Sequence, residues 1–134
     1  MIGPIGLKNN AMFRKPKPTT VKRISPRLRV LYGEEIALGP GKADLLAVVA
    51  ETGSIREAAD RMGMSYMRAW KLIKTMNACF KEPLVEAVRG GREYGGTSLT
   101  KAGHQALKLY QQLTNDCLKA TTIRWKELRT LLRD

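Results

Sequence analysis

The sequence predicts a mainly α-helical fold, and three observations lead to that prediction. Between Gly53 and Phe80, two short amphipathic segments are joined by a tight turn at Gly63. Two strand-like runs with a glycine-rich tip follow within residues 84–99, and a regular apolar stripe occupies residues 101–134. Helical apolar spacing and turn glycines in this order are typical of a winged helix-turn-helix. We therefore expect that fold, with small β-hairpins and a long C-terminal dimerisation helix.

The charge of the chain favours a polyanionic partner. Its 134 residues include 24 Lys and Arg but only 12 Asp and Glu, a formal net charge of +12. Such a surface attracts nucleic acid, anionic membrane or acidic protein. No apolar run approaches the roughly 20 residues needed to cross a bilayer, and the first residues lack the pattern of a secretory signal. We therefore expect a cytoplasmic protein without a membrane partner.

Residues that could carry chemistry are few and far apart. Cys79 and Cys117 are distant in sequence, and in a chain without an export signal reduced, partly buried thiols are favoured over a disulfide. The single histidine, His104, cannot form a metal site with two distant cysteines. No constellation of paired carboxylates, or of a nucleophile with a base, is recognisable. The sequence thus predicts no metal site, no cofactor and no enzymatic activity.

Residues 1–25 form a basic segment that we expect to be a flexible N-terminal arm. The segment contains six basic residues, no acidic residue occurs before Glu34, and Pro16, Pro18 and Pro26 oppose helix formation. Such a composition cannot bury enough apolar surface to order itself alone. Two interpretations stay open: an arm that binds DNA backbone or minor groove, and a solvated tail.

The domain that we expect over residues 26–100 begins with a hairpin and a helix. Residues 28–38 alternate in polarity around Tyr32-Gly33-Glu34-Glu35, which predicts a short β-hairpin with its turn there. Gly39-Pro40-Gly41 marks a break. Gly53 then stands at the C-terminal cap of a helix whose spaced positions are Leu45, Val48, Val49 and Thr52.

Two short helices joined at Gly63 form the predicted helix-turn-helix. Ser54 stands three residues before Glu57, a capping box in which the serine hydroxyl and the glutamate carboxylate each accept a free backbone N–H. Met62 and the small residues Ala58 and Ala59 are expected to face inward. Such small residues let two helices approach closely at a steep angle across a short turn.

The second helix of this motif, which Ser65 can cap, is the predicted DNA-reading element. One face carries an apolar stripe, which indicates a core face: Ala69, Leu72, Ile73, Met76 and Phe80. A helix of this kind places its outer face in the major groove, where base pairs differ in donors and acceptors. We predict base-edge or nearby contact by Ser65, Tyr66, Met67, Arg68, Trp70 and Lys71.

Lys74 lies further along the same helix, so its predicted role is contact with phosphate. The alternative is that this outer face is simply solvated. An exposed face that includes tyrosine, methionine and tryptophan is not typical of plain solvation, which favours the DNA-reading interpretation.

A hairpin after this helix is the predicted wing. Leu84 to Val88 and Thr97 to Leu99 have the pattern of two strands, with a glycine-rich tip at residues 89–96. Arg89 and Arg92 in the tip are predicted to follow phosphates or enter the minor groove. A phosphate-binding loop for nucleotides is disfavoured, because the tip joins two strands and has glycine where the lysine of such a loop would stand.

The apolar stripe of residues 101–134 predicts one long helix, with Thr100 as its cap. The stripe extends beyond what the small domain can cover, and association with a second copy would bury it. We therefore predict a homodimer formed through this helix; packing on the domain's own first helix is the alternative. The stripe comprises Leu107, Tyr110, Thr114, Leu118, Thr121, Trp125, Leu128 and Leu132.

These segments together resemble the DNA-binding domain of molybdate-responsive (ModE-type) transcriptional regulators, relatives of the LysR-type winged helix. The resemblance covers residues 25–118, and its most specific part runs from Gly53 to Trp70. It implies a winged helix-turn-helix that dimerises through its terminal helix and binds a pseudo-palindromic operator. The matching segments are LGP at 38–40, AETGSI at 50–55, Ala58-Ala59, GMSY at 63–66, Ala69-Trp70, Met76-Asn77, EPLV at 82–85, the glycine-rich tip and LTKAG at 99–103.

The chain departs from this family in one large respect. Full-length members carry C-terminal β-barrel modules that bind molybdate or a similar oxyanion. Residues 121–134 are too few to build even a small barrel, so we expect no oxyanion to bind this chain alone. The resemblance thus extends to the DNA-binding half of the family pattern and leaves the sensing half unsupported.

We therefore predict a sequence-specific, dimeric transcriptional regulator that binds double-stranded DNA, related to the molybdate-responsive regulators but lacking their oxyanion-binding modules. Two alternatives fit the basic charge. A non-specific architectural DNA-binding protein would bind any duplex, and a winged-helix protein-interaction module would use the third helix to bind a protein. Membrane-surface binding is disfavoured, because the arm lacks an amphipathic stripe with anchoring aromatic residues.

Overall fold

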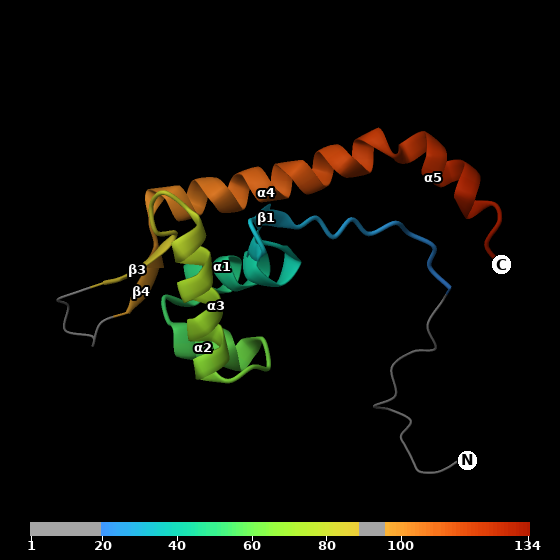
Figure 1. Cartoon of the computed structure of the whole chain (residues 1–134). Coiled ribbons are helices and arrows are strands. Elements are labelled where there is room, and N and C mark those ends of the chain that lie inside the picture. Colours follow the sequence, from blue (N-terminus) through green and yellow to red (C-terminus); the bar gives the residue numbers. More distant parts are fainter. Residues whose placement is uncertain (1–19, 89–95) are drawn as a thin grey trace, which may run out of the picture. The chain divides into compact units, whose positions relative to one another are not determined.

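The computed structural model describes residues 20–88 and 96–134. The described residues fall into two units, residues 26–120 and the terminal segments 20–25 and 121–134. Figure 1 labels the helices and strands. Within the described ranges, no helix is both long and apolar enough to span a bilayer. The first unit contains β1 (Val30–Tyr32), β2 (Glu35–Leu38), α1 (Pro40–Thr52), α2 (Ile55–Arg61), α3 (Tyr66–Cys79), β3 (Val85–Ala87), β4 (Thr97–Leu99) and α4 (Lys101–Ala120), and the second contains α5 (Thr122–Arg129).

The order of these elements confirms the predicted winged helix-turn-helix. β1 pairs with β2, and β3 pairs with β4, as two separate antiparallel hairpins. In the second hairpin, the wing, Val85 lies opposite Leu99 and Ala87 opposite Thr97. Arg89 and Arg92 lie outside the described residues, so their predicted contacts stay predictions.

Glycine and proline define the boundaries of the first hairpin and of α1. Gly33 occupies the left-handed region in the β1–β2 turn, at φ 62°. α1 begins inside the expected break, at Pro40, because the fixed φ of proline suits the first turn of a helix. Gly53 is left-handed at φ 69° and donates its N–H to the Val49 carbonyl, which confirms the predicted C-terminal cap.

The stripe predicted to form one helix over residues 101–134 forms two helices. α4 ends at Ala120 and α5 begins at Thr122, with Thr121 between them at φ −99° and ψ 2°. Thr121 and Thr122 are consecutive β-branched residues. They disfavour continuation of the α4 helix, because their side-chain torsions are restricted against the preceding helical turn. The prediction of a continuous terminal helix is therefore wrong.

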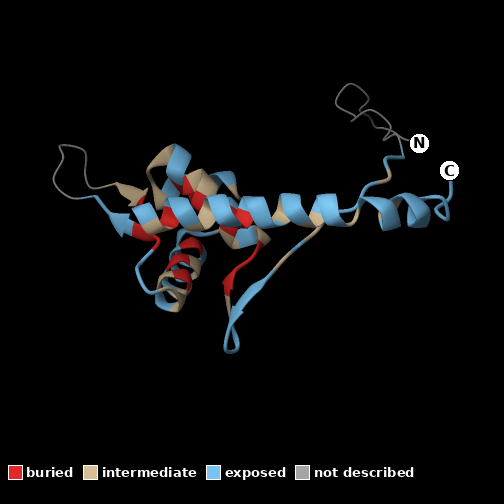
Figure 2. Cartoon of the chain, turned by 90° about the horizontal axis from the view of Figure 1, so that it is seen from above, coloured by how far each residue is buried: buried red, intermediate tan, exposed pale blue. Residues whose placement is uncertain are grey.

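α5 and the segments around it differ from the rest of the chain in burial. No residue of α5 is buried, and Figure 2 shows this helix as exposed or intermediate along its length. Within the same unit, Lys22 Nζ lies 3.6 Å from an Asp134 carboxylate oxygen. Because the Asp134 carboxylate is fully exposed, this pair contributes little to stability.

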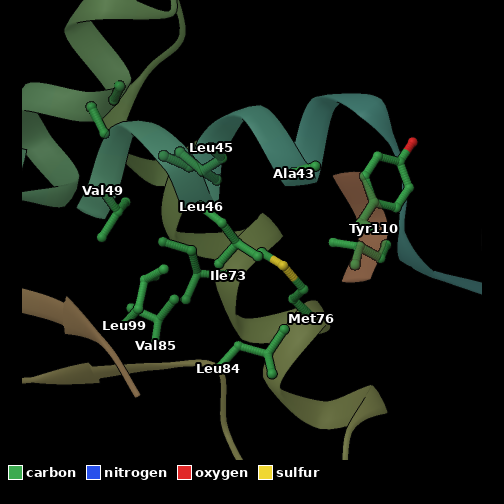
Figure 3. Close-up of a cluster of buried hydrophobic side chains, with 14 residues drawn as sticks. Ala43, Leu45, Leu46, Val49, Ile73, Met76, Leu84, Val85, Leu99 and Tyr110 are labelled. Atoms are coloured by element: carbon green, nitrogen blue, oxygen red, sulfur yellow. The ribbon is translucent and has the colours of Figure 1, made fainter. Parts of the chain in front are cut away.

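The hydrophobic core of residues 26–120 is built around α1. This helix contacts α2, α3, α4, β2 and β4, and its Leu45, Leu46 and Val49 are fully buried. Figure 3 shows Met76 of α3 close to Leu46, with Leu84 on the other side of Met76. Full burial of a side chain of this size stabilises the fold by about 1.5–3 kcal/mol.

The predicted inward-facing residues mostly reach this core. Ala58, Ala59, Ala69, Ile73 and Met76 are buried, as expected. The other two members of the predicted α3 stripe are only half-buried and pack against the edge of the core. Cys79 and Cys117 are both half-buried, as expected, and no disulfide joins them.

Tyr110 connects α4 to the segment before β1. Its ring is buried, and its hydroxyl donates a hydrogen bond of 2.8 Å to the Leu28 carbonyl. Burial raises the pKa of the Tyr110 hydroxyl; the positive charge of Arg27 opposes this shift and Asp44 adds to it. The first half of α4, which contains the buried Gly103 and Tyr110, therefore packs on its own domain, as the alternative to dimerisation envisaged, whereas most residues of its second half are exposed.

The segment Pro83–Val85, here called the junction, receives hydrogen bonds from Thr100, the residue before α4, and close packing from Gly103 of α4. The Thr100 N–H donates to the Leu84 carbonyl at 2.9 Å, and the Thr100 hydroxyl donates to the Pro83 carbonyl at 2.7 Å. The same hydroxyl oxygen accepts the Gly103 N–H at 2.9 Å, which confirms Thr100 as the α4 cap. Gly103 itself lies so close that a Cβ there would overlap the Leu84 carbonyl.

We predict that Gly103→Ala lowers the free energy of unfolding by about 3 kcal/mol, because the new methyl group would meet backbone that cannot move cheaply. Urea-induced unfolding followed by circular dichroism measures the change. Gly41→Ala is the matched control: Gly41 also lies in a helix, but a Cβ there has no neighbour within 4 Å. Equal stability of the two variants would contradict the close packing of α4 on the junction.

Candidate nucleic-acid interface

Ser54 begins the first helix of the helix-turn-helix, but the predicted capping box is only half formed. The Ser54 hydroxyl accepts the Glu57 N–H at 3.1 Å, as predicted. The Ser54 N–H, however, donates to Thr52 Oγ1 at 3.2 Å instead of to the Glu57 carboxylate. Thr52 reaches this position from the last turn of α1, where its hydroxyl donates to the Val48 carbonyl. The prediction that Glu57 completes the box is therefore wrong.

The turn between α2 and α3 is a Schellman motif centred on Gly63. Gly63 is left-handed at φ 67°, its N–H donates to the Asp60 carbonyl, and the Met64 N–H donates to the Ala59 carbonyl. Ser65 then caps α3, its hydroxyl accepting the Arg68 N–H at 3.1 Å. These local bonds determine where α3 begins relative to α2.

The two faces of α3 differ sharply in exposure. Ala69, Ile73 and Met76 are buried, whereas Tyr66 is 39% exposed and Met67 is 56% exposed. The Ser65 cap and the six α3 positions predicted to contact DNA are all exposed to solvent: Ser65, Tyr66, Met67, Arg68, Trp70, Lys71 and Lys74. The structure therefore brings together on one helix every predicted contact residue that it describes.

A shallow hollow of about 350 Å³ lies along this outer face. Met67, Arg68 and Lys71 line it, together with the Ser65 cap and the half-buried Thr75. The hollow mixes hydrogen-bond donors with a flexible thioether, which suits contact with base edges and thymine methyl groups.

Trp70 lies on the side of α3 that borders the wing. It is 38% exposed and, with Ile55 of α2, lines a hollow of about 280 Å³ shared with residues of β3 and β4. Lys74 Nζ stands 4.9 Å from the centre of the Trp70 ring, a cation–π geometry. The ring thus limits the positions available to the Lys74 ammonium beside the wing.

Asn77 joins α3 to the wing and was not singled out as a functional residue by the sequence analysis. Its Oδ1 accepts the N–H groups of Leu84 at 2.8 Å and Val85 at 3.2 Å, and its Nδ2 donates to the Val85 carbonyl at 3.0 Å. A single asparagine in a helix does not alter the apolar periodicity, so the sequence pattern gives no sign of this role. Only the Met76-Asn77 match in the family resemblance drew attention to Asn77.

Arg56 is a second residue near this surface that the sequence analysis did not assign. Its guanidinium carbon lies 4.9 Å from the centre of the Tyr66 ring, which brings the start of α2 against the start of α3. In the sequence, Arg56 lies between Ser54 and Glu57. The predicted capping box needs only those two residues, so it gave no reason to assign a role to Arg56. Arg61 of the same helix forms an ion pair with Glu51 of α1 at 2.9 Å.

The amino-acid sequence of this chain is similar to those of known proteins. Residues 42–104 match the bacterial regulatory helix-turn-helix proteins of the lysR family. The chain is 38% identical over 94 residues to the molybdenum transport protein ModE of Azotobacter vinelandii, a match that covers 70% of this chain and 35% of ModE. It is 36% identical over 87 residues to the DNA-binding transcriptional dual regulator ModE of Escherichia coli strain K12, covering 65% of this chain and 33% of that protein.

One further relative and one solved structure are also similar to this chain. The transcriptional regulator ModE of Yersinia pestis is 38% identical over 95 residues, covering 71% of this chain and 34% of that protein. A solved complex of the CbnR DNA-binding domain with DNA matches at 25% identity with a TM-score of 0.49, covering 69% of this chain and 97% of that one. The chain spans about a third of the length of the three ModE relatives.

We predict that Asn77→Ala lowers the free energy of unfolding by about 2–3 kcal/mol, because Leu84 and Val85 are buried and would lose their side-chain partner. Hydrogen exchange at these two amides should accelerate together with the loss of stability. Asn115→Ala, on the exposed surface of α4, is the control and should change stability by less than about 0.5 kcal/mol. Unchanged exchange at Leu84 and Val85 would contradict this role.

Proposed function

We propose, from the ModE-like, LysR-type winged helix-turn-helix domain that this chain contains, that the protein is a sequence-specific DNA-binding transcriptional regulator. The observation that carries the proposal is the outer face of α3, where exposed aromatic and thioether side chains stand among basic ones. The net charge of +12 supports a polyanionic partner. Relatives that are named transcriptional regulators support the same function.

In this proposal, α3 enters the major groove and α2 crosses the DNA backbone, as in other helix-turn-helix proteins. The N-terminal half of α3 faces the bases. Lys74 binds a phosphate near the wing, and the Trp70 ring holds the Lys74 ammonium in place there. Arg89 and Arg92 of the wing tip bind phosphates or the minor groove. The residues that face or border base edges are Ser65, Tyr66, Met67, Arg68, Trp70 and Lys71.

A homodimer is part of the same proposal. α4 exposes Leu109 (50%) and Leu113 (48%), and both line an apolar groove of about 650 Å³. Val30 and Tyr32 of β1 and Phe80 form other parts of the groove wall. A second copy that brought its own α4 to this groove would bury these side chains and form a symmetric interface. Two copies would present two α3 helices to a two-fold symmetric DNA site.

We expect Arg68→Ala to lower the preference for a selected genomic site over random duplex by about tenfold, because a bidentate base contact contributes about 1–3 kcal/mol of discrimination. Lys74→Ala should instead weaken binding to both duplexes equally. For Lys74→Ala, the slope of log K against log salt should fall in magnitude by about 0.9, the value for one phosphate contact.

Fluorescence anisotropy at several salt concentrations, on one fragment selected from genomic DNA and on one random duplex of equal length, measures these effects. The two variants are controls for each other, because each removes one positive charge from the same helix. Equal affinity of the unaltered protein for the two duplexes would contradict sequence specificity and favour the architectural alternative. Retention of a protein partner but of no DNA at low salt would favour the interaction module.

We predict that Leu113→Lys raises the dimer dissociation constant at least 100-fold. The substitution places a charge in the apolar groove twice, once in each copy of a symmetric interface. Sedimentation equilibrium measures the change. The control is Leu131→Lys, which alters an 80% exposed leucine beyond α5 and should leave the dissociation constant within about twofold. Equal dissociation constants for the two variants would contradict dimerisation through this groove.

A further inference from the structure

We propose that Arg56 is a further DNA-contact residue, which binds a phosphate at the edge of the major groove and is positioned by the ring of Tyr66. The proposal rests on the DNA-binding function proposed above and adds a residue from α2 to a surface otherwise predicted from α3 and the wing. The juxtaposition that carries it is the 4.9 Å separation between the Arg56 guanidinium carbon and the centre of the Tyr66 ring.

The location of Arg56 suits a phosphate contact. Arg56 is the second residue of α2, and Tyr66 is the first residue of α3, so their contact joins the starts of the two helices. In a helix-turn-helix, the first helix crosses the DNA backbone while the N-terminal residues of the second helix reach base edges. A cation held between these two helix starts therefore lies between the bases and the phosphates that flank them.

The contact leaves the donors of Arg56 available. A guanidinium is planar, and its N–H groups point outward in that plane. Stacking on an aromatic ring occupies a face of the plane and leaves N–H groups at its edge free for a phosphate. The ring also restricts the side chain before DNA arrives, which lowers the entropy cost of ordering it on binding.

Arg61 shows what an arginine with a structural partner looks like on the same helix. Glu51 of α1 binds Arg61 at 2.9 Å, whereas no carboxylate among the described residues lies within ion-pair distance of Arg56. The two arginines are five positions apart, so they project about 140° apart around the α2 axis. The charge of Arg61 is paired with Glu51 within the fold, whereas the charge of Arg56 is available to a ligand.

The test compares Arg56→Ala, Arg56→Lys, Tyr66→Phe and Arg61→Ala with the unaltered protein. The probe is one random duplex of about 30 base pairs, because a phosphate contact does not depend on sequence. Anisotropy titrations at several salt concentrations give both the affinity and the salt slope. Thermal unfolding of each variant without DNA separates lost contacts from lost stability.

Arg56→Ala should bind about tenfold more weakly, with a salt slope smaller by about 0.9 and unchanged thermal unfolding. Arg56→Lys should keep the slope but recover only part of the affinity, because an ammonium cannot stack as a plane. Tyr66→Phe keeps the ring and should keep the slope. Arg61→Ala should stay within about twofold of the unaltered protein.

Two results would overturn the assignment. If Arg56→Ala matched Arg61→Ala in affinity and slope, Arg56 would not contact DNA, although the proposed function would stand. A lower unfolding temperature with an unchanged slope would show that Arg56 only joins α2 to α3. If the unaltered protein bound no duplex at low salt, the proposed function would fail and this assignment with it.

Discussion

The junction at Pro83–Val85 is the constraint on which the arrangement of the proposed DNA-binding surface depends. Asn77 at the end of α3 binds the backbone of Leu84 and Val85, and Thr100 binds the backbone of Pro83 and Leu84 from the start of α4. Gly103 lets α4 approach the same backbone closely. Most of these bonds reach the main chain of Leu84 and Val85, which are buried residues whose polar groups are costly to leave unsatisfied. The junction thereby sets the position of the wing and of α4 relative to α3.

Aromatic residues on the outer face of α3 serve the surface in two ways. Tyr66 and Trp70 are exposed, yet each ring also faces a cation, Arg56 at one end and Lys74 further along. An unconstrained arginine or lysine would lose considerable side-chain entropy on binding a phosphate. Rings that hold these cations beforehand reduce that loss. We therefore regard the exposed aromatic residues as part of the electrostatic surface as well as candidates for reading bases.

Local chemistry explains why much of the fold could be predicted from the sequence. Serine caps at Ser54 and Ser65 and left-handed glycines at Gly53 and Gly63 act over a few residues, so their spacing alone places α1, α2 and α3. The apolar period of α3 likewise separates its core face from its outer face. The two errors have different physical causes. Thr52 takes the N–H that Glu57 was expected to bind, and consecutive threonines end α4 where the apolar stripe continues.

The sequence by itself determined the order of the elements, the two faces of α3, the family resemblance and the predominance of positive charge. Each follows from patterns within short stretches of chain, because helix caps, turns and apolar periodicity are local. Only the tertiary structure decided which residues hold these elements together. Asn77 binds a strand that follows it, Gly103 meets Leu84 across the junction, and the Arg56 guanidinium lies over the ring of the first residue of another helix. Such contacts depend on the packing of separate elements in three dimensions, and no periodicity along the chain encodes them.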